Sequence, residues 1–177
     1  GDDLVNIVAT SVIDACKENS ISLEDKDTVA VTEAVVAKSQ GNFATLNDIA
    51  TDVKNKFGDN TVGLILPILS RNRFSICLKG IARGMKKLYI QLSFPSDEVG
   101  NGILDEETFE KSKYNLSSVI TETQYKRTFG KFLHPFTGIN MVDFYRELVK
   151  SEDCEVEFVF SNDPKTILDY TKNVLVC

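Results

Sequence analysis

Hydrophobic residues recur at helical spacing in several segments of the chain. Leu4, Val8 and Val12 form a stripe that predicts a helix over residues 4–17, with acidic residues in its first turn. The same spacing predicts a helix ending at Gly58, capped by either Thr45 or Asn47, and another over 141–148 that follows the capping residue Asn140. Shorter helices are expected over residues 33–39, 105–113 and 121–129.

Other segments are short and β-branched, or apolar on both alternations, and these predict strands. The predicted strands cover residues 28–32, 61–69, 87–94, 154–160 and 174–176. Residues 74–78 are a further strand candidate, although 75–83 suits either a helix or a strand. Residues 93–102 carry the proline, glycine and asparagine typical of a loop.

The end of the chain gives the clearest fold signal. A strand over 154–160, a helix that starts at Asp163-Pro164 and a strand over 174–176 form a βαβ unit. We therefore expect an α/β fold, with α+β as the alternative, built on a mixed sheet with packed helices. The length of 177 residues and the lack of a linker favour a single domain over residues 1–177.

Composition sets the class of protein. A hydrophobic share of 42% is ordinary for a globular chain, and the longest apolar run, 62–69, is far shorter than the roughly 20 residues of a membrane helix. We expect a cytoplasmic protein without membrane contact. Because the chain starts at Gly1 and stops on a predicted strand, we also expect it to be the N-terminal part of a longer protein.

The cysteines and the one histidine give little sign of catalytic chemistry. Cys16, Cys77, Cys154 and Cys177 are scattered and form no CxxC pair, so we expect free thiols and neither a zinc site nor a redox dithiol. His134 lies in a His-Pro-Phe-Thr-Gly turn, and no feature places a cysteine beside it. A structural role for His134 is therefore favoured over catalysis.

Charge is distributed unevenly. The net charge of −6 argues against nucleic-acid binding, yet residues 60–96 contain no acidic residue. The cations of this stretch are Arg71, Arg73, Lys79, Arg83, Lys86 and Lys87. Clustered Arg and Lys suit phosphate oxygens, but such a run can equally be a solvated face that pairs with acids elsewhere. No P-loop and no GxGxxG motif is present, which excludes a standard nucleotide cradle.

Asp97 and Glu98 are the best-placed candidates for a metal site. They lie at the end of the cationic stretch, in a loop that contains glycine. Magnesium usually takes one or two carboxylates together with the phosphates of a substrate. The alternative is an ordinary solvated loop.

Two segments near the N-terminus carry a family resemblance. The opening Gly-Asp-Asp-Leu and the run Val-Ala-Val-Thr-Glu-Ala-Val-Val-Ala-Lys-Ser-Gln-Gly, residues 29–41, resemble the coenzyme F-420-0 gamma-glutamyl ligase family. Lys38 and Gly41 match its pattern, whereas Ala37 replaces a serine and Gln40 a glutamate. The resemblance is strong over residues 1–41 and weaker over 62–102.

The resemblance implies an enzyme that joins glutamate to a carboxylate of a phosphorylated cofactor. Such enzymes use GTP and Mg²⁺ or Mn²⁺, act on small molecules and work as homodimers. On this basis Lys38, Arg71, Arg73, Lys79 and Arg83 are the expected phosphate- and nucleotide-binding residues, with Asp97 and Glu98 as metal ligands. No catalytic residue is assigned.

One departure from the family pattern leaves alternatives open. Where the family has an aspartate and an asparagine near its metals, this chain has Ala82 and Met85. The first hypothesis is a GTP-dependent glutamate ligase. The second is a non-catalytic module that binds a nucleotide or anion without the metal site, and the third is a scaffold domain with neither property.

Overall fold

The computed structural model describes residues 1–58, 60–66 and 68–177, and leaves out the side chain of Arg73. These residues divide into two compact units, unit 1 over Gly1–Ala44 and unit 2 over Thr45–Cys177, which are described separately below. The single domain expected over the whole chain stays a prediction.

Unit 1 contains two of the predicted helices. Helix α1 spans Leu4–Glu18, and the carboxylate of Asp3 caps it by accepting a hydrogen bond from the Asn6 backbone at 3.1 Å. Helix α2 spans Glu33–Ser39. The strand predicted over residues 28–32 is wrong: the segment has no strand partner among the described residues, and a strand is stable only when a neighbour pairs with its backbone.

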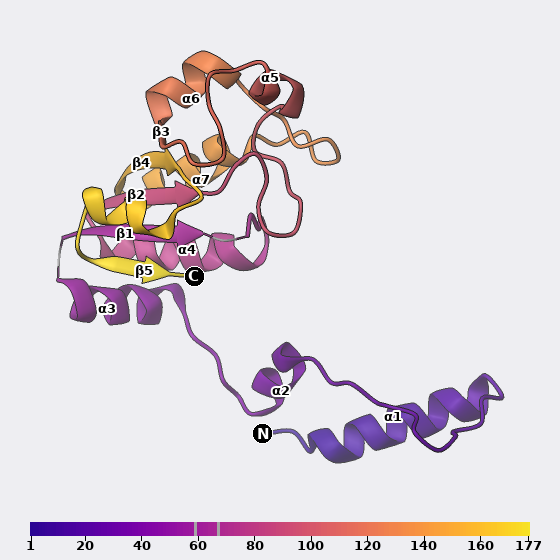
Figure 1. Cartoon of the computed structure of the whole chain (residues 1–177). Helices are drawn as coiled ribbons and strands as arrows, with labels where there is room; N and C mark the ends of the chain where they lie inside the picture. Colours follow the sequence, from indigo (N-terminus) through magenta and orange to yellow (C-terminus); the bar gives the residue numbers. More distant parts are fainter. Residues whose placement is uncertain (59, 67) are drawn as a thin grey trace. The chain divides into compact units, whose positions relative to one another are not determined.

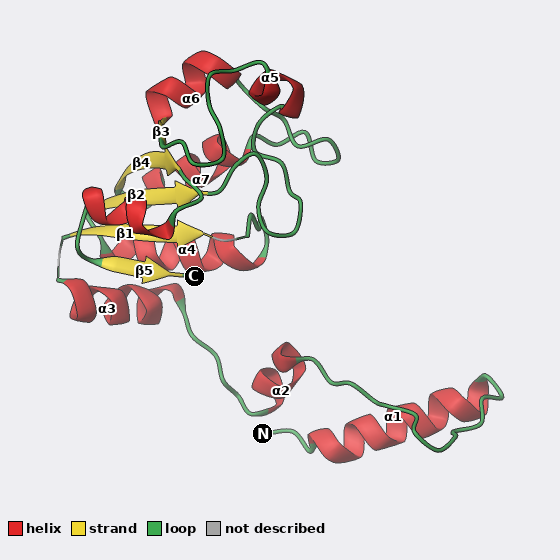
Figure 2. Cartoon of the chain, in the orientation of Figure 1, coloured by secondary structure: helices red, strands yellow, loops and turns green. Residues whose placement is uncertain are grey.

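Unit 2 is built on a mixed sheet, as predicted (Figure 2). Within the described residues the strand order is β3-β4-β2-β1-β5. The strands are β1 Thr61–Leu66, β2 Lys87–Leu92, β3 Ile120–Thr121, β4 Glu155–Phe160 and β5 Val174–Val176. All neighbours run parallel except the short β3, which is antiparallel to β4.

The helices described in unit 2 are α3 Leu46–Phe57, α4 Arg73–Gly84, α5 Glu106–Glu110, α6 Glu122–Phe129, α7 Met141–Lys150 and the 3-10 helix η1 Pro164–Asp169. Capping signals are predicted for three of them, namely α3, α7 and η1. Thr45, not Asn47, caps α3, and its side chain and that of Asp48 satisfy each other's backbone N–H groups. Asn140 caps α7 as predicted.

The strand candidate over residues 74–78 is wrong, because this segment forms the first part of α4. Phe74, Leu78 and Ile81 are all buried, and their spacing of four and three residues places them on one face of a helix. The apolar residues that suggested a strand therefore belong to a buried helical stripe.

Helices cover the sheet on both faces. Helices α4 and α7 pack together on one side and η1 lies on the other (Figure 1). Val62, Leu64 and Leu66 alternate towards the first side and are fully or nearly fully buried. Gly63 points to the opposite side, where a Cβ would come within 2.5 Å of the Ile167 side chain. The missing side chain of Gly63 thus lets η1 lie close to β1.

The βαβ segment predicted at the end of the chain has the expected order of strand, helix and strand, with two differences from the prediction. Its helix is the 3-10 helix η1, and its strands are not neighbours, since β5 pairs with β1 and β4 pairs with β2. The chain thus crosses over the sheet between β4 and β5. In open α/β sheets, ligands bind outside the carboxyl ends of the strands.

Candidate functional site

The connections that follow β1 and β2 lie next to each other at the carboxyl edge of the sheet in unit 2. Residues 68–72 lead from β1 into α4, and residues 93–104 follow β2. Because β1 and β2 are parallel and in register over their whole length, these connections start side by side. The fold therefore brings the cationic stretch, through Arg71, next to the loop that contains Asp97.

Asp97 joins the two connections. Asp97 is only 8% exposed. One of its carboxylate oxygens accepts hydrogen bonds from the backbone N–H groups of Val99 at 3.0 Å and Asn101 at 2.8 Å. The other oxygen accepts from the Leu69 backbone at 2.8 Å and from the Asn101 amide at 2.7 Å. Four N–H donors thus surround Asp97, which we call the Asp97 clasp.

A tyrosine fixes the position next to Arg71. The Tyr145 hydroxyl on α7 accepts from the Ser70 backbone N–H at 2.8 Å and lies 3.1 Å from the Ser70 carbonyl, to which it donates. Burial raises the pKa of Tyr145 to about 12, so the hydroxyl keeps the proton that it donates. The backbone that carries Arg71 is therefore held from two sides, by Tyr145 and by the clasp.

The turn that contains His134 reaches the same edge. The His134 backbone N–H donates to the Ile139 carbonyl at 2.9 Å, and the Gly138 N–H donates to the His134 carbonyl at 2.8 Å. Asn140 ties the base of this turn to α7, since its amide donates to the Phe132 carbonyl at 2.7 Å while its oxygen caps the helix. The sequence pattern suggested only a structural role for His134, whereas the structure places this residue at the same hollow as Arg71.

Two hollows open at this edge. The smaller one, the edge hollow, measures about 90 Å³ and is lined by Leu69, Arg71, Asn101, His134, Thr137 and Met141. The larger one, the outer hollow, measures about 490 Å³. Asn101 and His134 line both hollows, and Asp105, Glu106 and Glu107 line the outer one. Sequence reasoning missed Asn101 and Thr137, since an exposed loop residue shows no signal before its neighbours are known.

The predicted phosphate-binding residues do not all reach this edge. Arg71 does, and it makes no ion pair with any other part of the chain that the structure describes. Lys38 lies in the last turn of α2, in unit 1. The side chain of Arg73 falls outside the described part of the structure.

Lys79 and Arg83 instead form ion pairs with Glu152, which follows the C-terminal end of α7. The Arg83 guanidinium contacts both carboxylate oxygens of Glu152, at 2.7 and 3.2 Å, and also donates to Asn47 at 2.7 Å. Lys79 lies 3.4 Å from the same carboxylate. The hydrogen bond with Glu152 raises the pKa of Arg83. These two cations match the alternative expectation of a solvated, paired face.

The residues present do not fit a metal ion at Asp97. Both oxygens of the clasp face N–H donors, which a cation would have to displace. Glu98 is exposed, and the described residues contain no group of three or more His, Cys, Asp or Glu side chains that could hold a metal. Ala82 and Met85 are 0% and 5% exposed, so they are part of the hydrophobic core of α4 and its neighbours.

The cysteines are free, as predicted. Cys154 is buried, and burial raises its pKa to about 12, which keeps the thiol protonated and unreactive. The helices in the described ranges are all too short or too polar to cross a bilayer.

Comparison with known proteins identifies one family. Neither the curated proteins nor the solved structures contain a match to this chain. The sequence model of the F420-0:Gamma-glutamyl ligase family, however, matches residues 1–163 of the 177 residues. This match extends far beyond the two N-terminal segments that carried the resemblance, and it includes unit 1, the carboxyl edge and all of unit 2 except residues 164–177. The chain therefore belongs to the F420-0:Gamma-glutamyl ligase family.

Proposed function

We propose that this chain is a GTP-dependent ligase that forms an amide between L-glutamate and a phosphorylated carboxylate substrate such as coenzyme F-420-0. The observation that carries the proposal is the family match over residues 1–163, which supports a glutamate ligase role. GTP as co-substrate, use of Mg²⁺ or Mn²⁺, a homodimer and a cytoplasmic location belong to the proposal, and they come from the resemblance.

The chemistry needs a cation near an oxyanion. A carboxylate is a poor electrophile because its leaving group would be oxide, whereas transfer of a phosphoryl group to it creates a leaving group. The amine of glutamate can then attack the carbonyl, and phosphate leaves with the C–O electron pair. Donors fixed in advance around the developing negative charge lower the barrier to both steps.

The carboxyl edge of unit 2 offers such a position. Arg71 makes no ion pair within the described part of the chain, and its backbone neighbours are held by Tyr145 and the Asp97 clasp, so little motion is needed to present its charge. Lys79 and Arg83 both form ion pairs with Glu152. We therefore assign the substrate-facing role to Arg71 and not to the cations further along α4.

The test is direct. The purified chain is incubated with GTP, Mg²⁺ or Mn²⁺, glutamate and a series of phosphorylated acids, and GDP and the glutamyl adduct are both measured. The proposal expects the two products in equal amounts with at least one acid. If no acid leads to consumption of GTP, the ligase assignment fails.

A second candidate is a non-catalytic module that binds a nucleotide or anion. The saturated Asp97 clasp and the burial of Ala82 and Met85 favour it, because the chain offers no carboxylate pair for a metal at these positions. Calorimetry with GTP and with GDP, each with and without Mn²⁺, separates the candidates. Binding that is insensitive to Mn²⁺ and leads to no product supports the module, and no binding at all supports a scaffold.

A further inference from the structure

The edge hollow combines a cation that makes no ion pair with the described residues, and donors from one other segment. Arg71 comes from the connection after β1, and His134 and Thr137 come from the turn before α7. Leu69 and Met141, both 9% exposed, form its apolar floor. Arg71 and Thr137 are exposed and His134 is half-buried, so an anion can reach all three from solvent.

The hydrogen bonds of the turn determine what His134 can offer. The Phe136 backbone N–H lies 3.4 Å from the Nδ1 atom of His134, which accepts from it. An imidazole that accepts at Nδ1 carries its proton on Nε2 and is a donor there. His134 is therefore set up to donate a hydrogen bond, as an anion requires.

Thr137 is arranged in the same sense. Its hydroxyl oxygen accepts from the Ile139 backbone N–H at 3.4 Å, which leaves the hydroxyl proton for a further acceptor. Asn101 has its two amide protons directed to Asp97 at 2.7 Å and to the Leu69 carbonyl at 3.5 Å. Asn101 thus shapes the wall, and the donors are Arg71, His134 and Thr137.

The edge hollow has one cation and no carboxylate among its lining residues. Asp97 lies outside this lining, and both of its oxygens accept hydrogen bonds from the clasp. Asp105 accepts hydrogen bonds from Thr108 and, together with Glu106 and Glu107, lines the outer hollow and not the edge hollow. The lining of the edge hollow therefore suits an anion, and its volume of about 90 Å³ has room for one phosphate or carboxylate group.

We infer that the edge hollow binds a single oxyanion group, a phosphate or a carboxylate, through the Arg71 guanidinium, the His134 Nε2–H and the Thr137 hydroxyl. This site does not require ligase activity, so it stands or falls separately from the proposed function. Phosphate, with its higher charge and tetrahedral set of acceptor oxygens, is the better match to three donors from two directions.

The single histidine of the chain makes a specific probe, because its imidazole resonances in an NMR spectrum belong to His134 alone. The full chain is titrated with inorganic phosphate, with acetate and, at matched ionic strength, with chloride. The inference expects a saturable shift of the His134 resonances with phosphate, a weaker one with acetate and none with chloride. A response to phosphate that does not saturate or that equals the response to chloride overturns it.

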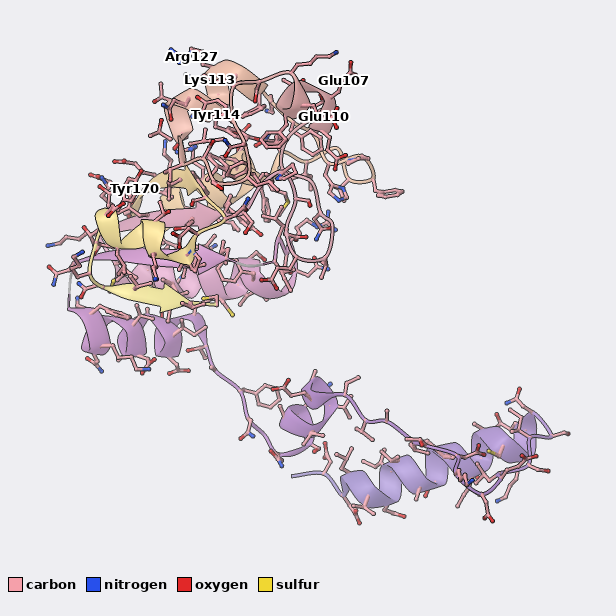
Figure 3. All side chains as sticks on the ribbon, in the orientation of Figure 1. Glu107, Glu110, Lys113, Tyr114, Arg127 and Tyr170 are labelled. Carbon is pink, nitrogen blue, oxygen red and sulfur yellow. The ribbon has the colours of Figure 1, made fainter. Side chains whose placement is uncertain are left out.

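Variants identify the donors. Arg71→Gln is expected to weaken phosphate binding by about 10- to 100-fold, which corresponds to about 1.5–3 kcal/mol for a hydrogen bond to a charged group. The matched control is Arg127→Gln, since Arg127 is an exposed cation on α6 that lines neither hollow (Figure 3). Equal affinity of the Arg71→Gln variant and the wild-type chain, both folded by their melting curves, contradicts the inference.

Discussion

Replacing Asp97 tests whether this residue is a structural clasp or a metal ligand. Asp97→Ala leaves four N–H groups without their acceptor, of which the one on Leu69 is buried and the others partly buried. An unsatisfied buried donor costs about 1–3 kcal/mol, and partly buried donors cost less because water can reach them. We expect a loss of about 3 kcal/mol in the free energy of unfolding of unit 2.

The assay is thermal unfolding followed by circular dichroism. For a unit of this size, a loss of about 3 kcal/mol lowers the Tm by roughly 10 °C. The control is Glu98→Ala, which removes the neighbouring exposed carboxylate and should change the free energy of unfolding by less than about 0.5 kcal/mol. If Asp97→Ala has the same Tm as Glu98→Ala and the wild type, the Asp97 clasp does not stabilise unit 2 and the structural role of Asp97 is refuted.

Mn²⁺ supplies the second arm of this experiment. If Asp97 were a metal ligand, Mn²⁺ would raise the Tm of the wild-type chain, and the variant would lose that rise. The clasp predicts that any effect of Mn²⁺ on the Tm is the same with and without the Asp97 carboxylate.

Three further outcomes follow from contacts in unit 2. Burial alone would raise the pKa of Glu122, but the hydrogen bonds of its carboxylate, above all with Arg146, outweigh burial and lower the pKa below 4.5. The ionised carboxylate therefore stabilises unit 2 above pH 4.5, and this stabilisation is lost as the pH falls through the lowered pKa. The Tm difference between the wild type and Glu122→Gln should shrink in acid. Arg83→Gln should lower the Tm, because it removes the ion pair between Arg83 and Glu152. Phosphate affinity measured by titration should stay within twofold of wild type, because the Arg83 guanidinium already binds Glu152. Gly63→Ala should destabilise unit 2 by about 1–3 kcal/mol in urea unfolding, because the added Cβ meets Ile167; unchanged stability would show that η1 moves away freely.

Local patterns predicted most of the elements because the signals that set them are local. The cap at Asn140 and the stripe after it define α7, and the alternation over 154–160 defines β4. The segment 74–78 failed because a buried helical stripe and a buried strand look alike over five residues. The segment 28–32 failed because a strand depends on a pairing partner that its own residues do not reveal.

The candidate site was predicted only in part, and the reason is distance along the chain. Six cations that are close in sequence suggested one phosphate site, yet Arg71 precedes α4 whereas Arg83 lies in its last turn, about 15 Å from the start of the helix at 1.5 Å per residue. The acid that pairs with Arg83 is Glu152, which comes from a remote segment. The donors around Asp97 are mostly backbone N–H groups, which every residue type except proline has and which the sequence therefore cannot reveal.

We propose that this ligase-family chain does its chemistry at the carboxyl edge of unit 2, at Arg71, and not at the far end of α4. Glutamyl-adduct formation by the wild type, Arg71→Gln and Arg83→Gln is compared under identical conditions with GTP, glutamate and the acid that the wild type accepts. We expect Arg71→Gln to lower kcat/KM by about 10- to 100-fold, as for the loss of a charged hydrogen bond, while Arg83→Gln stays close to wild type. Adduct formation that survives Arg71→Gln but is lost with Arg83→Gln would contradict this proposal, as would the absence of any adduct from the wild-type chain.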